Sequence, residues 1–213
     1  MSSRRRRPSP IAELTDRALV RLYWPVALRP AFDALFAIDD AMADVVAKAT
    51  EPALAAIKLA WWRERLQELD AGKVPAEPRL RAVADELLTR GVAGSELAKL
   101  EEGWAELLTE RPDPERVLKR GDCLFAIGAR LLGAEYLPLM GAGRLFAAGD
   151  LARRRIDAPG APEVTDLPHF PRVLRPLTAL AALAKRDLLR SEPEATPGRA
   201  LALLRHRLTG RIA

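Results

Sequence analysis

The chain has 213 residues, of which 49% are apolar and 30% charged, as is typical of a folded globular domain. No run approaches the roughly 18 apolar residues needed to span a bilayer, and no apolar stretch follows the basic N-terminus as in a signal peptide. A single cysteine excludes an internal disulfide, and with only two histidines the chain offers no zinc-ligand cluster. We therefore expect a cytoplasmic protein, with a peripheral position at a membrane as the alternative.

The net charge of +5 is concentrated at the N-terminus. Arg4, Arg5, Arg6 and Arg7 contribute +4, which leaves 30 basic and 29 acidic residues elsewhere. A nearly neutral body is not the pattern of a nucleic-acid-binding domain, so nucleic acid is not an expected partner. Residues 1–9 are predicted to form a disordered basic tail. The more specific functional interpretation is that this tail makes weak contact with an anionic membrane surface.

Residues 10–213 are predicted to form one all-α domain of about eight or nine helices, without a credible strand. Proline at helix starts and glycine after helix ends mark most of the boundaries, and Ser95 is a candidate N-cap. Residues 157–171 carry four prolines and read as a linker or surface crossing. The predicted helices are 11–23, 30–48, 51–72, 77–90, 95–111, 114–133, 138–156, 172–190 and 197–209.

The helix predicted over 51–72 carries two adjacent tryptophans. Its apolar residues recur at steps of three and four, the period of one buried helix face. Trp61 and Trp62 point about 100° apart, so together they widen the buried arc. This pattern favours a core helix flanked on two sides by others. The apolar residues concerned are Leu54, Ile57, Trp61, Trp62, Leu66 and Leu69.

An acidic group lies on the preceding helix. Asp33, Asp40 and Asp44 return to within about 40° of one another around the helix axis. Asp40 and Asp44 have the spacing with which a helix presents paired carboxylates to magnesium and diphosphate, and as two unpaired carboxylates they would repel. The competing interpretation is an ordinary solvated face, helped by Arg29 and Lys48 four residues outward from Asp33 and Asp44.

The histidines, the cysteine and two neighbouring glycines are predicted to have structural and not catalytic roles. His169 and His206 have no serine, cysteine or carboxylate partner by spacing, so both are predicted to lie on the surface. Cys123 lies among apolar residues and is predicted to be a small buried hydrophobe and not a nucleophile. The pair Gly141 and Gly143 follows no strand, which favours helix packing over dinucleotide binding.

Residues 27–72 resemble the front of squalene/phytoene synthase family proteins; they read ALRPAFDALFAIDDAMADVVAKATEPALAAIKLAWWRERLQELDAG. That family pairs an "ALYAF"-type helix with an "EP…RLxWWRExL" helix. Weaker similarity continues through RGDCLFAIGARLLG, GAGRLFAAGDLARRR and VLRPLTALAALAKRDLLR. The resemblance implies an all-α isoprenoid synthase fold, in which two isoprenyl diphosphates condense in a central cavity between two magnesium-binding aspartate motifs. The candidates to line such a cavity here are Phe36, Asp40, Asp44, Trp61, Trp62 and Arg65.

The metal motifs of the family are eroded in this chain. In the family's register, Ala43 and Ala47 stand where outer aspartates of the first motif belong. The second motif needs an asparagine, and the chain contains none. Where that motif should fall, Asp150 and Asp157 have the wrong spacing and lie beside Arg153, Arg154 and Arg155.

With alanine at the metal position, the tryptophan signature is similar to that of the motif-eroded branch that includes a mitochondrial complex I assembly factor. We expect a binding or assembly factor with no catalytic residue, metal or cofactor. Its expected partners are an apolar or isoprenoid lipid in a central cavity, or another protein. One alternative is a prenyltransferase that uses Mg²⁺ at Asp40 and Asp44. A second is an adaptor that binds a membrane or nucleic acid through its basic tail.

Overall fold

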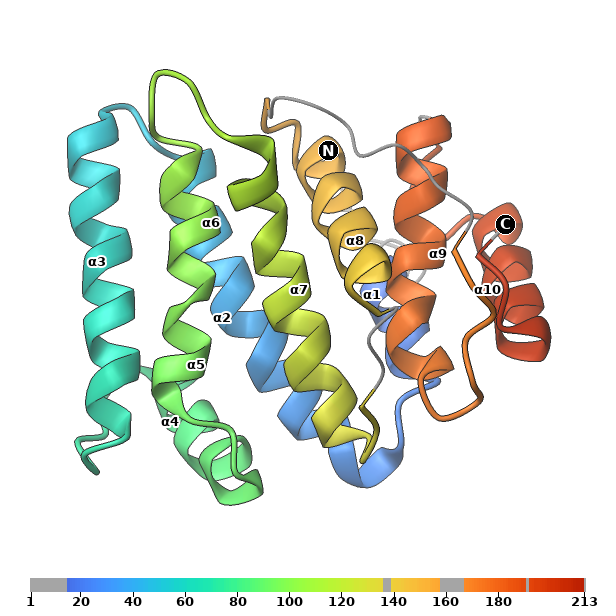
Figure 1. The fold of residues 1–213 in the computed structure, drawn as a ribbon, viewed down its shortest axis with the longest axis horizontal. Helices are drawn as coiled ribbons and strands as arrows, with labels where there is room; N and C mark the ends of the chain where they lie inside the picture. The colour runs from blue at the N-terminus through green and yellow to red at the C-terminus, as the bar shows by residue number, and fades with distance from the viewer. Residues whose placement is uncertain (1–14, 136–138, 158–166, 191, 213) are drawn as a thin grey trace, which may run out of the picture.

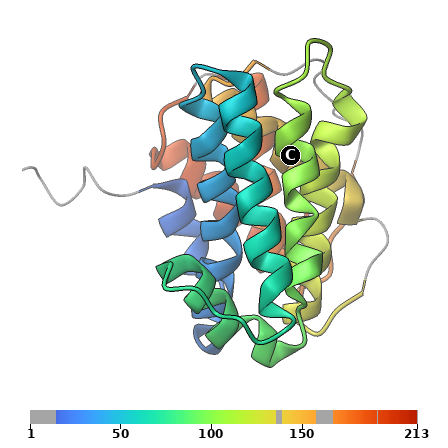
Figure 2. The same ribbon diagram turned by 90° about the vertical axis from the view of Figure 1, so that its left-hand side faces the viewer.

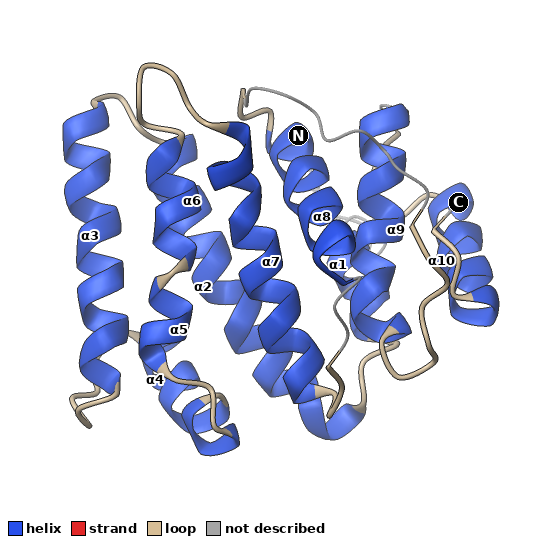
Figure 3. Cartoon of the chain, viewed as in Figure 1, coloured by secondary structure: helices blue, strands red, loops and turns tan. Residues whose placement is uncertain are grey.

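The structure is a computed structural model that describes residues 15–135, 139–157, 167–190 and 192–212. The predicted basic tail with Arg4–Arg7 lies outside the described residues, as does most of the predicted crossing at 157–171. The described residues form helices and no strand (Figure 3), which confirms the all-α prediction. None of these helices is long and apolar enough to pass through a membrane.

The helix boundaries follow the proline and glycine signals of the sequence closely. Proline occupies the first turn of α2, α3, α4, α7, α9 and α10, where its missing amide hydrogen costs nothing. Short 3₁₀ turns cover Val26–Leu28 and Leu88–Arg90. The helices are α1 (Asp16–Arg21), α2 (Arg29–Ala47), α3 (Pro52–Leu69), α4 (Pro78–Glu86), α5 (Gly94–Ala98), α6 (Leu100–Glu106), α7 (Pro114–Leu131), α8 (Leu139–Arg154), α9 (Arg175–Leu189) and α10 (Pro197–Thr209).

The single helix predicted at 95–111 is divided into α5 and α6, and Ser95 is not its N-cap. The N-cap position is Ala93, whose side chain cannot accept a hydrogen bond. The Asp70 carboxylate at the end of α3 accepts instead from the backbone N–H groups of Gly94 at 2.6 Å and Ser95 at 2.9 Å. A residue distant in the sequence therefore satisfies the free amides of this helix end, which local sequence could not reveal.

The helices form a bundle that α3 and α10 close at opposite edges (Figure 1). Between these edges α6 packs on α7, α7 on α8, α8 on α9 and α9 on α10. Behind this row in Figure 1, α2 contacts α3, α4, α6 and α7. The view onto α3 in Figure 2 places α2 across the bundle from α7. More than half of the residues of α2 are buried, as they are in α8 and α9.

The prediction that the tryptophan helix is central and buries both tryptophans is wrong. The side chain of Trp62 is 8% exposed and packs in the core, whereas Trp61 is 41% exposed. Leu54 and Ile57 are exposed beside Trp61. The helix has apolar residues on two faces, and only the face with Trp62 and Leu66 turns inward, since α3 lies at the edge of the bundle.

Two glycines bring α7 and α8 into close contact. A Cβ atom on Gly121 would lie 2.0 Å from the carbonyl oxygen of Gly143, and one on Gly143 would lie 2.4 Å from that of Gly121. Any larger residue would push the two backbones apart. The predicted helix-packing role of Gly143 is confirmed, and the close contact brings Arg120 of α7 beside Asp150 of α8.

Candidate functional site

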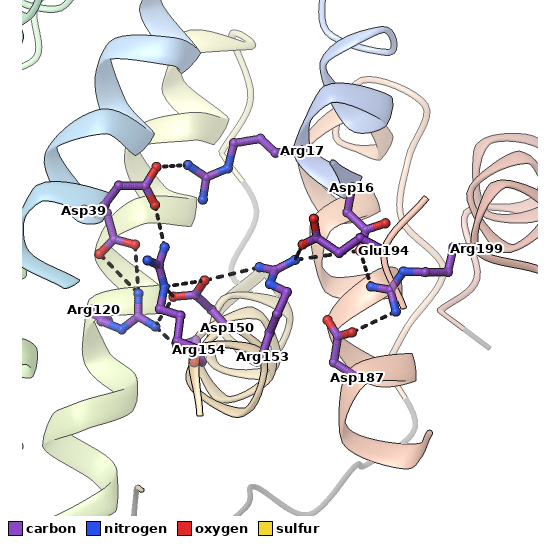
Figure 4. A network of polar contacts seen from close by, with 12 residues as sticks. Asp16, Arg17, Asp39, Arg120, Asp150, Arg153, Arg154, Asp187, Glu194 and Arg199 are labelled. Carbon is purple, nitrogen blue, oxygen red and sulfur yellow. Dashed lines mark hydrogen bonds and ion pairs between the residues drawn. The ribbon is translucent and has the colours of Figure 1, made fainter. Parts of the chain in front are cut away.

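A fully buried arginine of α7 joins α2 to α8. Arg120 Nη1 donates to Asp39 Oδ2 of α2 at 2.8 Å, and Arg120 Nη2 donates to Asp150 Oδ2 of α8 at 2.9 Å (Figure 4). All three side chains are 0% exposed. Trp104 of α6 donates its indole N–H to Asp39 at 2.8 Å, and the Arg120 guanidinium lies 4.0 Å from the centre of the Trp104 ring. Hydrogen bonds and a cation–π contact thus hold this guanidinium in one position.

Two further arginines, Arg154 and Arg17, lie next to this centre. Arg154 Nε donates to Asp150 at 3.0 Å, and Arg154 Nη2 donates to Asp40 at 2.5 Å. Arg17 of α1 also forms an ion pair with Asp40. Asp40 therefore connects α1, α2 and α8 and is not free to bind a metal ion alone.

The polar network continues towards the C-terminal helices (Figure 4). Arg153 lies 3.2 Å from Asp150 and 3.7 Å from the buried Asp16 of α1. The buried Arg199 of α10 pairs with Asp16 and, at 2.8 Å, with Asp187 of α9. These ion pairs tie α1, α8, α9 and α10 together and extend away from the centre.

The electrostatics of the centre follow from burial opposed by pairing. Complete burial raises the pKa of Asp39, although Arg120 and the Trp104 N–H act in the opposite direction. Burial alone would also raise the pKa of Asp150, but Arg120, Arg154 and Arg153 lower it to about 2. The pKa of Arg154 is raised, because Asp150 and Asp40 outweigh the effect of its burial. Asp150 is therefore held as a carboxylate among cations.

The donor set of this centre does not fit magnesium. Three carboxylates, Asp39, Asp40 and Asp150, contact four guanidinium groups, so the positive charges that they contact already match or exceed their own negative charge. The four belong to Arg17, Arg120, Arg153 and Arg154. Magnesium requires several oxygen ligands in octahedral geometry, and here those oxygens accept N–H groups. Within the described ranges, no three His, Cys, Asp or Glu side chains converge on a possible metal position.

Of the six predicted cavity-lining residues, Phe36 and Asp40 lie together, because both contact Arg17, and Trp61, Trp62 and Arg65 lie on α3. Phe36 is buried in the core, where its ring centre lies 5.7 Å from that of Trp24 and 5.8 Å from that of Phe146. Trp61 lies on the outer surface of α3, and Trp62 lies under it. Arg65 pairs with Glu68 at 3.1 Å on the same helix.

The two aspartates of the predicted pair, Asp40 and Asp44, have different partners. Asp44 pairs with Lys48 at 2.9 Å, as one interpretation of the sequence expected, while Asp40 pairs with two arginines. The expectation of two unpaired, repelling carboxylates is therefore wrong. So is the expected role of Arg29, which donates to the backbone carbonyls of Trp24 and Leu22. Arg21 pairs with Asp33 in its place, at 2.7 Å.

The two histidines have different environments. His169 is exposed, as predicted. His206 is 1% exposed, and the prediction that it lies on the surface is wrong. Its Nδ1 donates to the carbonyl oxygen of Arg211 at 3.0 Å, and its Nε2 lies 2.9 Å from Thr178 Oγ1. Burial lowers the pKa of His206, so it is a neutral structural side chain at pH 7.

The only cysteine, Cys123, is partly buried. Its Sγ lies 3.5 Å from the carbonyl oxygen of Glu96. Burial raises its pKa to about 12, so the thiol is not an activated nucleophile. Cys123 lines a mainly apolar cavity of about 500 Å³ with Phe125, Ile127 and Met140.

Sequence reasoning missed the centre of the network, namely Asp39, Trp104 and Arg120. One signal was available: Asp39 lies on the apolar side of α2 among Leu35, Ile38 and Met42. A carboxylate on a buried face must be paired or pay a large desolvation cost, which implies a buried cation elsewhere in the chain.

Comparison with known proteins gives one result. Residues 13–116, just under half of the chain, match the squalene/phytoene synthase family model. The matched segment includes α2 and the tryptophan helix α3 and ends at the start of α7. That family has the all-α isoprenoid synthase fold, in agreement with the helical bundle. No curated protein and no solved structure matches the chain.

Proposed function

We propose that the whole chain is a squalene/phytoene synthase-type protein that has lost the magnesium-dependent condensation and acts as a binding or assembly factor. The proposal rests on one observation: Arg120 bridges Asp39 of α2 and Asp150 of α8. In the family these two regions face each other as metal-binding motifs. Here a guanidinium group that belongs to the fold replaces the metal ions as the counter-charge.

The chemistry explains why this replacement opposes catalysis. A diphosphate leaving group develops negative charge that metal ions neutralise in the transition state. Arginine can also bind diphosphate, but Arg17, Arg120 and Arg154 are already paired with carboxylates. A substrate would have to break these ion pairs before the arginines could bind it.

Two surfaces support a binding role. On α3, Leu54, Ile57 and Trp61 form an exposed apolar stripe of the kind that is typical of protein contacts. Between α5, α7 and the start of α8, the cavity lined by Cys123 and Phe125 could accept an apolar or isoprenoid chain. An assembly role like that of the motif-eroded branch fits the first surface.

Thermal unfolding with ligand tests the loss of metal-dependent binding. A ligand that binds only the folded state at a hundredfold excess over its Kd stabilises it by about 2.7 kcal/mol. We expect magnesium with an unreactive isoprenyl diphosphate to leave the melting temperature of the parent unchanged. A rise that Asp40→Asn abolishes, while Asp33→Asn retains it, would restore the prenyltransferase. Asp33 is the matched control because it is ion-paired on the same helix, with Arg21, outside the network.

The binding role has its own test in affinity capture of the native protein. We expect a co-purifying protein that is depleted when Ile57→Ser and Trp61→Ser are combined. In parallel, mass spectrometry of lipids that are captured with the protein tests whether the cavity holds an apolar or isoprenoid chain. Recovery of the same proteins in the same amounts by parent and variant would exclude the α3 stripe as the partner surface.

A further inference from the structure

The outer face of α10 carries a stripe of exposed leucines. Leu201, Leu204 and Leu208 are 66%, 46% and 70% exposed. They recur at steps of three and four, so they lie within about 60° of one another around the helix. The opposite side, with Leu203 and His206, is buried against the bundle. The helix is thus apolar on both its inner and its outer face.

The charged side chains of α10 itself, and of the residues that follow it, are all positive. From residue 195 to residue 213 the sequence has four arginines and no acidic residue. Arg199 is buried in the network, whereas Arg205, Arg207 and Arg211 form no ion pair with any carboxylate of the described residues. The central arginines are instead paired with carboxylates, as Arg120 and Arg154 show. The surface of α10 therefore lacks negative charge of its own.

The stripe continues onto the end of α1. The Arg207 guanidinium lies 4.9 Å from the centre of the Tyr23 ring, and next to Tyr23 the apolar side chains of Leu22 and Val26 are exposed. Arg175 supports this junction, because its Nη1 donates to the backbone carbonyls of Arg207 and Leu208, each at 2.9 Å.

A basic pocket lies at this junction. It has a volume of about 350 Å³, and none of the described residues that line it is acidic. Tyr23, Arg172, Arg207 and Leu208 are among its walls, which therefore combine apolar and cationic groups. Such a pocket is suited to a phosphate group attached to an apolar body.

We propose that the outer face of α10, with the adjoining end of α1, docks on an anionic lipid bilayer. The leucines enter the boundary between headgroups and acyl chains, and Arg172, Arg205 and Arg207 contact lipid phosphates. A helix of 13 residues, about 20 Å long, lies in the plane of the interface in this arrangement. The proposal does not depend on the loss of catalysis.

The positive charge of α10 favours an anionic bilayer over a second copy of the chain as its partner. A two-fold contact through α10 would bring the unpaired Arg205 and Arg207 of two copies together, which like-charge repulsion opposes. A bilayer that contains anionic lipids supplies both an apolar layer and negative charge. In Figure 1, α10 lies at the edge of the molecule, where a flat surface can approach it.

Flotation with vesicles tests the proposal on the full chain. The probes are vesicles of phosphatidylcholine alone and of phosphatidylcholine mixed with phosphatidylglycerol. We expect binding to the mixed vesicles only, and weaker binding at high ionic strength. Replacing Leu201, Leu204 and Leu208 by serine should weaken it roughly ten-fold or more. Arg205→Gln and Arg207→Gln should each weaken it about five-fold.

Matched controls separate this surface from others. The pair Leu54→Ser and Ile57→Ser removes equally exposed apolar residues from α3 and should leave vesicle binding unchanged. Replacing Arg4–Arg7 by glutamine tests the tail, and binding should persist in that variant. Circular dichroism and thermal unfolding should match the parent in all variants, because the replaced residues of α10 and α3 are exposed.

Several results would overturn the proposal. The parent could fail to float with the mixed vesicles at low ionic strength. The leucine variant could bind as the parent does, or binding could vanish with the tail arginines alone. A change of oligomeric state in the leucine variant, without any vesicle binding by the parent, would instead identify a contact between copies. Inorganic phosphate that binds Arg172 and Arg207 without any vesicle binding would identify a free-anion site.

Discussion

Removing the central guanidinium group with Arg120→Met tests the energetic role of the network. The substitution keeps an unbranched apolar side chain but removes the guanidinium group, which leaves Asp39 and Asp150, each 0% exposed, without their shared cation. Breaking a buried ion pair by removing one partner costs about 3–5 kcal/mol, because the remaining charge stays buried. In a domain of this size that loss lowers the melting temperature by about 6–20 °C.

Arg130→Met on the same helix is the matched control. Arg130 pairs with Glu96 at 2.7 Å, but its side chain is 41% exposed. Exposed ion pairs contribute at most about 1 kcal/mol, so this variant should unfold close to the parent. Urea unfolding followed by tryptophan fluorescence measures the free energy of unfolding of both variants.

The dependence on pH and a rescue variant separate lost charge pairing from lost packing. Without Arg120 the pKa values of Asp39 and Asp150 in the folded chain rise. A carboxyl group whose pKa is higher in the folded than in the unfolded chain lowers the free energy of unfolding as pH rises. The deficit of Arg120→Met should therefore shrink as pH falls from 7 to 5. Adding Asp39→Leu and Asp150→Leu should recover most of the stability, since apolar replacements often equal a buried ion pair. A loss below about 1 kcal/mol for Arg120→Met would refute the reasoning.

Three further outcomes follow from the packing. Trp62→Ala should cost about 3–5 kcal/mol in urea unfolding and Trp61→Ala clearly less, because only Trp62 is buried; equal costs would contradict this. Gly121→Ala should cost about 1–3 kcal/mol or more in the same assay, because its Cβ would lie 2.0 Å from a carbonyl oxygen of α8; a neutral result would count against the close contact. The lowered pKa of His206 means that the unfolded chain binds a proton that the folded chain does not, so stability should fall from pH 7 to pH 5. His206→Gln should flatten that slope, and an unchanged slope would exclude His206 as its source.

The fold class could be predicted from the sequence because proline and glycine residues mark most of the helix ends. Pro52 and Gly72 bracket α3 as predicted, and Gly72 has the left-handed φ of +74° that favours glycine there. Which face of a helix turns inward depends on its neighbours. The apolar period of α3 fits two faces, and only its position at the edge of the bundle decides that Trp61 is exposed.

The centre of the site depends on pairing between distant residues. Asp39 and Arg120 are 81 positions apart, and Arg120 and Asp150 are 30 apart. Helical periodicity relates only residues of the same helix, and for that reason the sequence pattern indicated Asp40 and Asp44 as a pair. The ion pairs that neutralise Asp40 come from Arg17 of α1 and Arg154 of α8, which no local pattern connects to it.

The most direct test of the central claim is release of diphosphate from farnesyl or geranylgeranyl diphosphate by the purified chain with magnesium. Because the ion pairs of Arg120 and Arg154 neutralise the carboxylates of α2 and α8, we expect no release above that of a buffer blank. Magnesium-dependent release that Asp40→Asn abolishes and Asp33→Asn retains would contradict the account and identify the chain as a working prenyltransferase.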